Sequence, residues 1–358
     1  MPAALGSGMR SAACLKPVQS RRGQGMTETL TEARHYGTDR SGKLRCGLCP
    51  HNCLIADGKS GTCGVRSNRG GTLYTLIYGE VSAVAMDPIE KKPLYHFFPG
   101  SQILSIGTKG CNFKCSFCQN WHISQDLKAH TSRYSPEAIV RLAEQNSSVG
   151  IAYTYSEPMI WFEFVVDCAR LARERGLVNV MVTNGYVNPG PLDELLGCID
   201  AMNIDLKSFR EESYRRVQKG GLSGVLETIR AASSRCHVEL TTLVVTGIND
   251  DLGEMREIIS WIAALDRNIP WHISRYYPNF KYDAAPTDVD FMLEVCREAR
   301  EKLHYVYCGN IAGSHGTSDT LCPSCGATVV SRTGYSTSTR ALEGGRCARC
   351  GFDLRIRQ

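Results

Sequence analysis

Short apolar runs alternate with amphipathic stretches along residues 101–307. A short apolar run bounded by turn residues is typical of a buried strand, whereas apolar residues spaced three and four apart are typical of a helix. Strands are predicted at residues 101–107, 150–155, 178–183, 201–206, 238–245, 271–276 and 304–307. Helices are predicted at residues 135–145, 157–175, 189–196, 224–233, 252–265 and 288–302. Repeated strand–helix units imply a parallel sheet, and about six of them predict an α/β fold with a partial (β/α)6 barrel.

The rest of the chain falls into flanking segments. Residues 1–40 show no hydrophobic periodicity, and the stretch before Glu28 holds four basic residues and no acidic one. This faintly resembles a transit peptide, but a disordered tail, or a mis-set start with Met26 in place of Met1 as the true first residue, is the simpler expectation. Residues 41–100 are expected to form a cysteine-rich segment with a β-rich lead-in, residues 101–318 the partial barrel, and residues 319–358 a small cysteine-rich module.

Length and charge narrow the classes of function. A chain of 358 residues suits one large α/β domain with appended segments. Its net charge of +5 is small for this length and gives no case for nucleic-acid binding. Since no run of eighteen apolar residues occurs, no membrane span is predicted.

The seventeen cysteines are unevenly distributed. Three lie in one loop, at Cys111, Cys115 and Cys118. We call two further groups the N-terminal quartet (Cys46, Cys49, Cys53 and Cys63) and the C-terminal quartet (Cys322, Cys325, Cys347 and Cys350). The other six are Cys14, Cys168, Cys198, Cys236, Cys296 and Cys308, and five of them lie in apolar stretches where small core residues are expected. Clustered C-x2-C pairs without a secretion signal indicate metal binding in a reducing cytoplasm and not disulfides.

The cysteine loop, residues 110–125, has the spacing C-x3-C-x2-C and follows a predicted buried strand directly. Iron–sulfur clusters are held by cysteine thiolates, and three thiolates leave one iron of a four-iron cluster open for a substrate or cofactor. A structural zinc loop completed by a distant residue is the alternative. The position after a strand favours the cluster, because α/β folds build their active sites there.

The two quartets have metal-ligand spacing of different kinds. The N-terminal quartet is spaced C-x2-C-x3-C-x9-C, which suits zinc, a second iron–sulfur cluster or, least of the three, a metal-free cysteine-rich turn. The C-terminal quartet consists of two C-x2-C pairs separated by 21 residues, which predicts a zinc-ribbon-like module. That module could serve as a docking surface or could simply stabilise the C-terminus.

The predicted strand and the Cys111–Cys118 loop resemble the radical S-adenosylmethionine (radical SAM) superfamily. Within it, residues 44–358 resemble the radical SAM enzymes of the AmmeMemoRadiSam system, which are related to pyruvate formate-lyase-activating enzymes. The resemblance rests on Cys-Gly-Leu-Cys-Pro-His-Asn-Cys at residues 46–53, Cys-Gln-Asn-Trp at 118–121, Tyr-Thr-Tyr-Ser-Glu-Pro at 153–158 and the C-terminal quartet. It implies a [4Fe–4S] cluster on the three loop cysteines, with SAM bound at its open iron.

The resemblance also implies a reaction and partners. One electron from a flavodoxin or ferredoxin would cleave SAM to methionine and a 5′-deoxyadenosyl radical, which would abstract hydrogen from an unknown substrate. AMMECR-type and Memo-type proteins are the implied partners. Two alternatives stay open: an activating enzyme whose substrate is the backbone of a glycyl-radical protein, and a zinc-binding scaffold without catalysis.

The resemblance further implies a set of SAM contacts near strand ends. They are Ser156, Glu157, Thr183, Asn184, Asp205, Lys207 and His272. The superfamily has Gly-Gly-Glu-Pro where this chain has Tyr155-Ser156-Glu157-Pro158, and an aspartate is usual at the position of Val182. Five of these contacts have a plainer interpretation: Glu157 as a helix N-terminal carboxylate, Asn184 as a turn residue, Asp205 and Lys207 as a buried ion pair, and His272 as a core histidine.

Overall fold

The structure is a computed structural model that describes residues 30–311 and 317–358. Residues 1–29 of the predicted disordered tail therefore lie outside the described residues, and only its residues 30–40 are described. Cys14 and the two candidate start residues, Met1 and Met26, lie outside them as well. Within the described ranges, no helix combines the length and apolar character that crossing a membrane requires.

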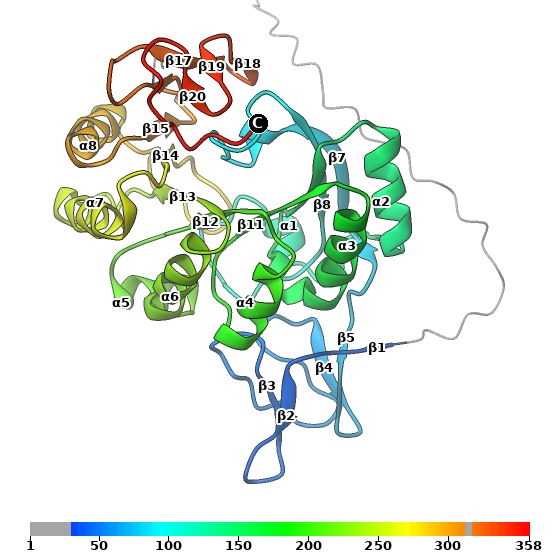
Figure 1. Cartoon of the computed structure of the whole chain (residues 1–358). Helices are drawn as coiled ribbons and strands as arrows, with labels where there is room; N and C mark the ends of the chain where they lie inside the picture. The colour runs from blue at the N-terminus through cyan, green and yellow to red at the C-terminus, as the bar shows by residue number, and fades with distance from the viewer. Residues whose placement is uncertain (1–29, 312–316) are drawn as a thin grey trace, which may run out of the picture.

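An eight-stranded sheet forms the centre of the molecule (Figure 1). Seven strands are parallel neighbours: β8 (Gln102–Gly107), β10 (Gly150–Thr154), β11 (Val178–Thr183), β12 (Ala201–Asp205), β13 (His237–Val244), β14 (Trp271–Arg275) and β15 (Val306–Gly309). The antiparallel strand β7 (Ala83–Pro88) pairs with β8 at one edge. All seven predicted parallel strands are present, and the α/β fold with a parallel sheet is confirmed.

Six helices connect successive parallel strands and lie around the outside of the sheet (Figure 1). They are α2 (Pro136–Gln145), α3 (Phe162–Glu174), α4 (Pro189–Leu196), α6 (Leu222–Ser233), α7 (Leu252–Asp266) and α8 (Val289–Lys302). Helix α2 shows why the sequence begins a helix there: the Ser135 hydroxyl accepts a hydrogen bond from Ala138 N at 3.3 Å, and Pro136 occupies the first turn. Strand β10 is buried along its whole length, as a strand covered on both faces must be.

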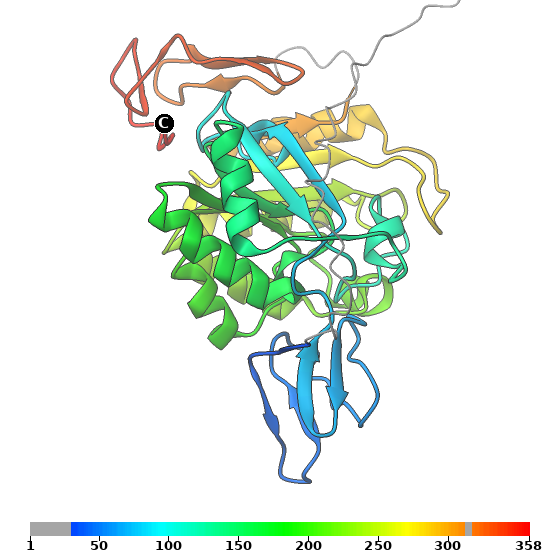
Figure 2. The same cartoon turned by 90° about the vertical axis from the view of Figure 1, so that its right-hand side faces the viewer.

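Short elements complete the two ends of the molecule. Before the sheet lie β1 (Thr31–Glu32), β2 (Tyr36–Thr38), β3 (Leu44–Cys46), β4 (Arg66–Arg69), β5 (Thr72–Thr75) and β6 (Glu80–Val81), and η1 (Ile89–Lys91) lies between β7 and β8. Loops of the sheet carry α1 (Trp121–Ser124), β9 (Ser132–Arg133), η2 (Pro158–Trp161), α5 (Glu211–Ser213) and η3 (Tyr214–Gln218). After it come β16 (Thr320–Leu321), β17 (Thr328–Thr333), β18 (Ser336–Ser338), β19 (Leu342–Glu343) and β20 (Arg346–Cys347). The segments before and after the sheet lie at its opposite ends (Figure 2).

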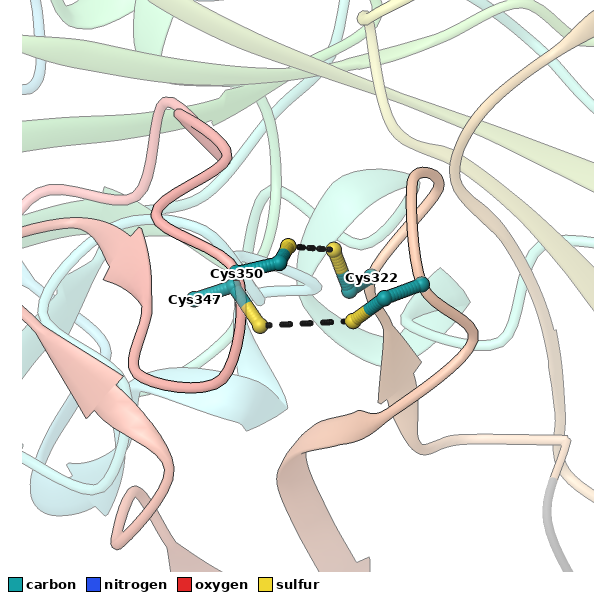
Figure 3. Close-up of side chains that lie close together, drawn as sticks. Cys322, Cys347 and Cys350 are labelled. Carbon is teal, nitrogen blue, oxygen red and sulfur yellow. Dashed lines mark hydrogen bonds between the residues drawn. The ribbon is translucent and has the colours of Figure 1, made fainter.

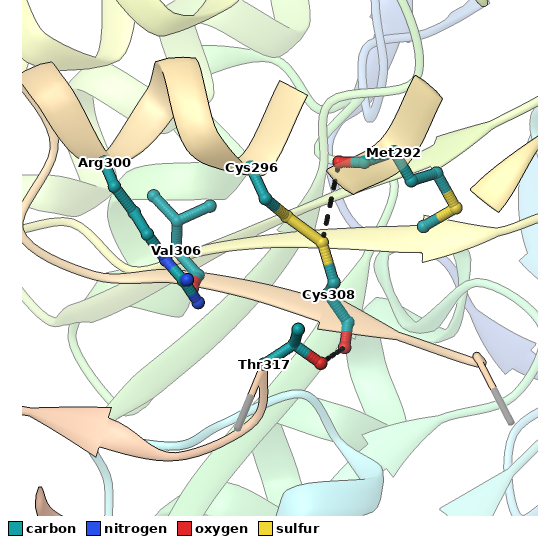
Figure 4. The surroundings of a disulfide bond; sticks show 6 residues. All are labelled: Met292, Cys296, Arg300, Val306, Cys308 and Thr317. Atoms are coloured by element: carbon teal, nitrogen blue, oxygen red, sulfur yellow. Dashed lines mark hydrogen bonds between the residues drawn. A yellow bond between two sulfur atoms is a disulfide. The ribbon is translucent and has the colours of Figure 1, made fainter. Parts of the chain in front are cut away.

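One prediction about the cysteines is wrong. Cys296 in α8 and Cys308 in β15 are both buried, as expected of core residues, but they are joined by a disulfide (Figure 4). The chain turns back after α8 so that β15 runs beneath the helix, which brings side chains twelve residues apart face to face. This pairing depends on how the helix and strand pack, and the apolar pattern does not report it. Cys168 and Cys198 are buried and unpaired, as predicted.

Candidate active site

A cavity of about 1070 Å³ opens at the carboxyl ends of the parallel strands. Nine of the ten predicted cluster and SAM ligands line it together: Cys111, Cys115, Cys118, Ser156, Glu157, Thr183, Asn184, Asp205 and Lys207. They come from the loops or ends of β8, β10, β11 and β12, whose parallel register brings their carboxyl ends to one edge. Enzymes of the α/β class place catalytic groups at this edge.

The cysteine loop leaves β8 through Gly110, which has φ of +90°. A Cβ atom there would lie 2.8 Å from Val65 Cγ1 and 3.1 Å from the Cys63 carbonyl oxygen, so the close approach requires glycine. Cys111 Sγ accepts hydrogen bonds from Phe113 N at 3.3 Å and from Asn184 Nδ2 at 3.7 Å. Donors of this kind stabilise a thiolate that binds a metal.

Burial favours the neutral thiol at these cysteines. Cys111 and Cys115 are buried, and desolvation raises the pKa of Cys115 to about 12. A thiolate ligand therefore requires positive charge beside it, which an iron–sulfur cluster supplies. Phe113 and Phe117 line the same cavity and limit water around the loop. The donor set, its burial and its hydrogen bonds fit a [4Fe–4S] cluster.

Tyr155 adopts a left-handed backbone conformation, with φ of +72°. Tyr155 stands where the superfamily pattern has a glycine. Its backbone keeps the conformation that glycine adopts easily, and contacts of its side chain hold the bulky residue in that conformation. The Tyr155 hydroxyl donates to Asp87, and Lys92 Nζ lies 2.7 Å from Asp87 Oδ2 and 3.3 Å from the hydroxyl. Beside it, the buried Ser156 Oγ has no hydrogen-bond partner among the described residues and lines the cavity. An unsatisfied hydroxyl buried next to a cavity suits a site for a polar ligand.

The Glu157 carboxylate is engaged by the protein itself. It accepts hydrogen bonds from Met159 N at 3.0 Å, Thr183 Oγ1 at 2.6 Å and Asn184 N at 2.8 Å. It thus caps η2, as the plainer interpretation expects, and also fixes the loop after β11. Burial raises the pKa of Glu157 to about 7 despite these donors. The structure makes Glu157 a positioning residue for Thr183 and Asn184.

Asn184 connects this loop to the cysteines. Its Nδ2 donates to Asn112 Oδ1 at 2.8 Å, and its Oδ1 accepts from Tyr186 N at 2.9 Å. Asn112 Nδ2 in turn donates to the Tyr186 carbonyl at 2.9 Å. The Asn–Gly turn is therefore present, as the plainer interpretation of Asn184 expects, and it also orients an amide toward Cys111.

Asp205 and Lys207 form an ion pair at the cavity wall, with Nζ 2.7 Å from Oδ2. Burial lowers the pKa of Lys207, but Asp205 and Cys115 outweigh it and raise the pKa above its usual range. The lysine is therefore a fixed positive charge facing the cavity, suited to a carboxylate.

The structure does not bring His272 to this cavity. Its Nε2 lies 2.6 Å from Glu239 Oε2, inside the sheet, so the core interpretation describes it. Ser274, two residues further along β14 and on the same face, lines the cavity instead. Thr241 from β13 also contributes and was not predicted. Residues two apart in a strand share a face, so extending the pattern from His272 by two residues toward the carboxyl end would have identified Ser274.

The two quartets differ in geometry. In the C-terminal quartet, Sγ of Cys322 lies 3.6 Å from that of Cys350, and Sγ of Cys325 lies 3.7 Å from that of Cys347 (Figure 3). All four sulfurs lie within 4.8 Å of one another, which is compatible with a single metal ion. The N-terminal quartet surrounds a separate cavity, described below.

Comparison with known proteins agrees with this geometry. Residues 105–262 match the model of the radical SAM superfamily. An uncharacterised protein of Methanocaldococcus jannaschii is 41% identical over 91% of this chain and 99% of its own length. The pyruvate formate-lyase-activating enzyme of Clostridium pasteurianum is 23% identical over 54% of this chain and 85% of its own.

A solved structure shares the fold. A radical SAM methyltransferase from Sphaerobacter thermophilus superposes with a TM-score of 0.50 at 13% identity, over 78% of this chain and 76% of that one. Enzymes of this superfamily use a [4Fe–4S] cluster and SAM and generally take electrons from flavodoxin or ferredoxin. From its fold, its site and these relatives, the chain belongs to the radical SAM superfamily and is a radical SAM enzyme.

Proposed function

We propose that residues 101–318 form a partial barrel that binds a [4Fe–4S] cluster on Cys111, Cys115 and Cys118 and binds SAM beside it. When bound, these groups supply reductive cleavage of SAM to methionine and a 5′-deoxyadenosyl radical, which abstracts hydrogen from a substrate. The observation that carries the proposal is the shared cavity, where the three thiols meet polar groups from three further strand ends.

The chain's own residues would bind and orient the cofactor. Lys207 is placed to pair with a carboxylate, and the unsatisfied Ser156 Oγ, buried beside the cavity, would bond a polar atom of the ligand. Glu157 holds Thr183 and the Asn184 backbone in place, so that these two residues line the cavity in a fixed arrangement. Phe113 and Phe117 keep water from the loop, which protects a reactive radical from side reactions.

Anaerobic reconstitution with iron and sulfide tests this proposal. After reduction with SAM present, 5′-deoxyadenosine should be released, and Cys111→Ala should abolish the release. Cys236→Ala is the matched control, because Cys236 is half-buried and belongs to neither quartet nor the loop. Release that persisted in Cys111→Ala would contradict the proposal. A colourless protein containing only zinc would favour the scaffold alternative.

A glycyl-radical-activating enzyme is the second candidate. One observation favours it: the relative from Clostridium pasteurianum is named for activation of pyruvate formate-lyase. Such an enzyme needs a partner protein with a glycyl-radical loop. Mixing the reduced enzyme and SAM with a candidate partner should then give an organic radical signal in electron paramagnetic resonance (EPR) that depends on the partner's glycine.

We also propose AMMECR-type and Memo-type proteins as partners, which is supported by the resemblance of residues 44–358. We propose zinc for the C-terminal quartet, supported by its sulfur separations, and a zinc-ribbon-like module for residues 319–358. Co-purification of tagged protein with each partner type tests the partners, and the zinc content of the protein with and without the C-terminal quartet tests the metal.

A further inference from the structure

The N-terminal quartet lines a small pocket that is separate from the cavity beside the cysteine loop. All four cysteines line it, together with the apolar residues Leu48, Ile55 and Ile160. Cys46 and Cys63 are buried, whereas Cys49 and Cys53 are partly exposed. The site is therefore partly enclosed and partly accessible.

The sulfur spacing separates the two quartets. A tetrahedral zinc site with Zn–S bonds of about 2.3 Å places its sulfurs about 3.8 Å apart. The C-terminal quartet matches this spacing, at 3.6 and 3.7 Å. In the described part of the chain, the sulfurs of the C-terminal quartet all lie within 4.8 Å of one another. The sulfurs of the N-terminal quartet do not come this close together. Thiolates around a four-iron cluster bind different irons and stand further apart, around a cavity.

The surroundings of the N-terminal quartet suit a negatively charged group. Arg66 is buried and lines the pocket; its Nη1 pairs with Glu163 Oε1 at 2.9 Å, and its Nε–H is left without a hydrogen-bond partner among the residues described. Cys53 Sγ accepts a hydrogen bond from Thr62 N at 3.4 Å and lies 3.3 Å from Thr62 Oγ1. Four thiolates with a metal centre carry net negative charge, which a buried guanidinium and N–H donors stabilise.

The same segment contacts the cysteine loop directly. His51, which lines the quartet's cavity, places Nε2 2.8 Å from the carbonyl oxygen of Asn112, the neighbour of Cys111. On the other side, Gly110 packs against the Cys63 carbonyl. The two cysteine sites are therefore joined through one hydrogen bond and one backbone contact.

We propose that the N-terminal quartet holds a second [4Fe–4S] cluster, which passes electrons to the cluster of the cysteine loop. The electron-transfer step rests on the proposed function, whereas the metal assignment does not. A low-potential donor of the flavodoxin or ferredoxin class loses one electron to the second cluster, which then loses one electron to the loop cluster. The partly exposed Cys49 and Cys53 mark the side from which a donor can approach.

Metal analysis tests the assignment without any activity. Wild-type protein, prepared anaerobically, should contain about eight irons and eight sulfides, and the Cys111→Ser/Cys115→Ser/Cys118→Ser variant about four of each. That variant should stay brown and show an EPR signal after reduction. Its N-terminal quartet is intact, so it is informative even if variants of the quartet fail to fold. Two zinc ions and no iron in it, or no metal outside the C-terminal quartet, would overturn the assignment.

The electron-transfer step has its own test. In Cys49→Ala/Cys53→Ala, reduction of the loop cluster by reduced flavodoxin, followed by freeze-quench EPR, should slow at least tenfold. Reduction by dithionite, a small diffusible reagent, should be unchanged. An unchanged rate with flavodoxin would overturn the relay. If the proposed function alone fails, the triple variant still holds its four irons while wild-type protein releases no 5′-deoxyadenosine, so the two failures are distinguishable.

Discussion

Tyr155 shows how one residue can hold a strained backbone next to a cofactor site. A tyrosine with positive φ costs roughly 1–3 kcal/mol and persists only where its surroundings enforce it. Here the Asp87 carboxylate accepts from its hydroxyl and is itself paired with Lys92. The strain places Ser156 at the cavity with its hydroxyl unsatisfied.

We expect Tyr155→Phe to lose that hydrogen bond to a charged group. The free energy of unfolding should fall by about 1.5–3 kcal/mol, and SAM should bind more weakly because the Ser156 loop is less well held. Chemical denaturation and calorimetric titration with SAM measure the two effects. Tyr335→Phe, at an exposed residue, is the control. Unchanged stability and affinity would show that Asp87 does not hold the loop.

Lys207 should contribute to SAM affinity through its fixed positive charge. Replacing it in Lys207→Gln leaves the Asp205 carboxylate unpaired at the cavity wall and removes a charged hydrogen-bond donor. The expected cost of about 1.5–3 kcal/mol corresponds to a roughly 10–100-fold higher Kd for SAM. Iron content should be unchanged, which separates this effect from loss of the cluster. Lys128→Gln, at an exposed position, should bind SAM normally.

At the scale of elements, a buried ion pair attaches the N-terminal segment to the sheet. Arg66 in β4 lies 2.9 Å from Glu163 in α3, and both side chains are almost fully buried. The same carboxylate accepts from Arg34 N at 2.7 Å. A buried pair adds little net stability, but loss of one partner leaves an uncompensated charge.

Arg66→Met should therefore destabilise the fold by about 3–5 kcal/mol, as measured by denaturant unfolding. Arg256→Met removes an arginine of similar geometry from the exposed pair with Glu298 and should cost less than about 1 kcal/mol. Equal effects of the two variants would contradict a special role for burial at Arg66.

Sequence periodicity predicts the elements well because strands and helices repeat their apolar positions locally. The parallel strands and crossover helices follow from this, and so does the gathering of Cys111, Glu157, Asn184 and Lys207 at strand ends. Local patterns do not report contacts between distant side chains. The Cys296–Cys308 disulfide, the engagement of the Glu157 carboxylate and the pairing of His272 with Glu239 all depend on packing.

At the scale of the whole molecule, the two cysteine-rich segments lie at opposite ends of one sheet (Figure 2). The N-terminal quartet meets the end that carries the cavity lined by the cysteine loop. The other end is covered by the C-terminal module, where His96 lies buried with Nε2 2.6 Å from the Tyr307 hydroxyl. The hydroxyl also lies 2.9 Å from Thr320 Oγ1, so a single buried network joins the sheet to the module.

This junction should make the fold sensitive to acid. Burial lowers the pKa of His96 to about 3, from 6.5 in an unfolded chain. As pH falls from 6.5 toward 3, the unfolded chain binds a proton that the folded state refuses, so stability decreases by up to about 1.4 kcal/mol per pH unit. Above pH 6.5 both states are neutral and the effect vanishes.

The free energy of unfolding, measured between pH 4.5 and 7.5, should show this slope. In His96→Gln the slope should be smaller by the contribution of one proton. Glutamine can still bond the Tyr307 hydroxyl, so the network is not simply deleted. His122→Gln, at an exposed position, should retain the wild-type slope. An identical slope in His96→Gln would assign the acid sensitivity to other groups.

The last residues of the chain complete the far end of the sheet. Arg357 pairs with Phe97 in a parallel bridge: Phe98 N donates to the Arg357 carbonyl at 2.8 Å, and Arg357 N donates to the His96 carbonyl at 2.9 Å. During synthesis, residues 96–98 leave the ribosome long before their partner has been made. Since domains fold as the chain emerges, the sheet can form while this end is still uncovered, and the end is closed only after residue 357 has left the ribosome.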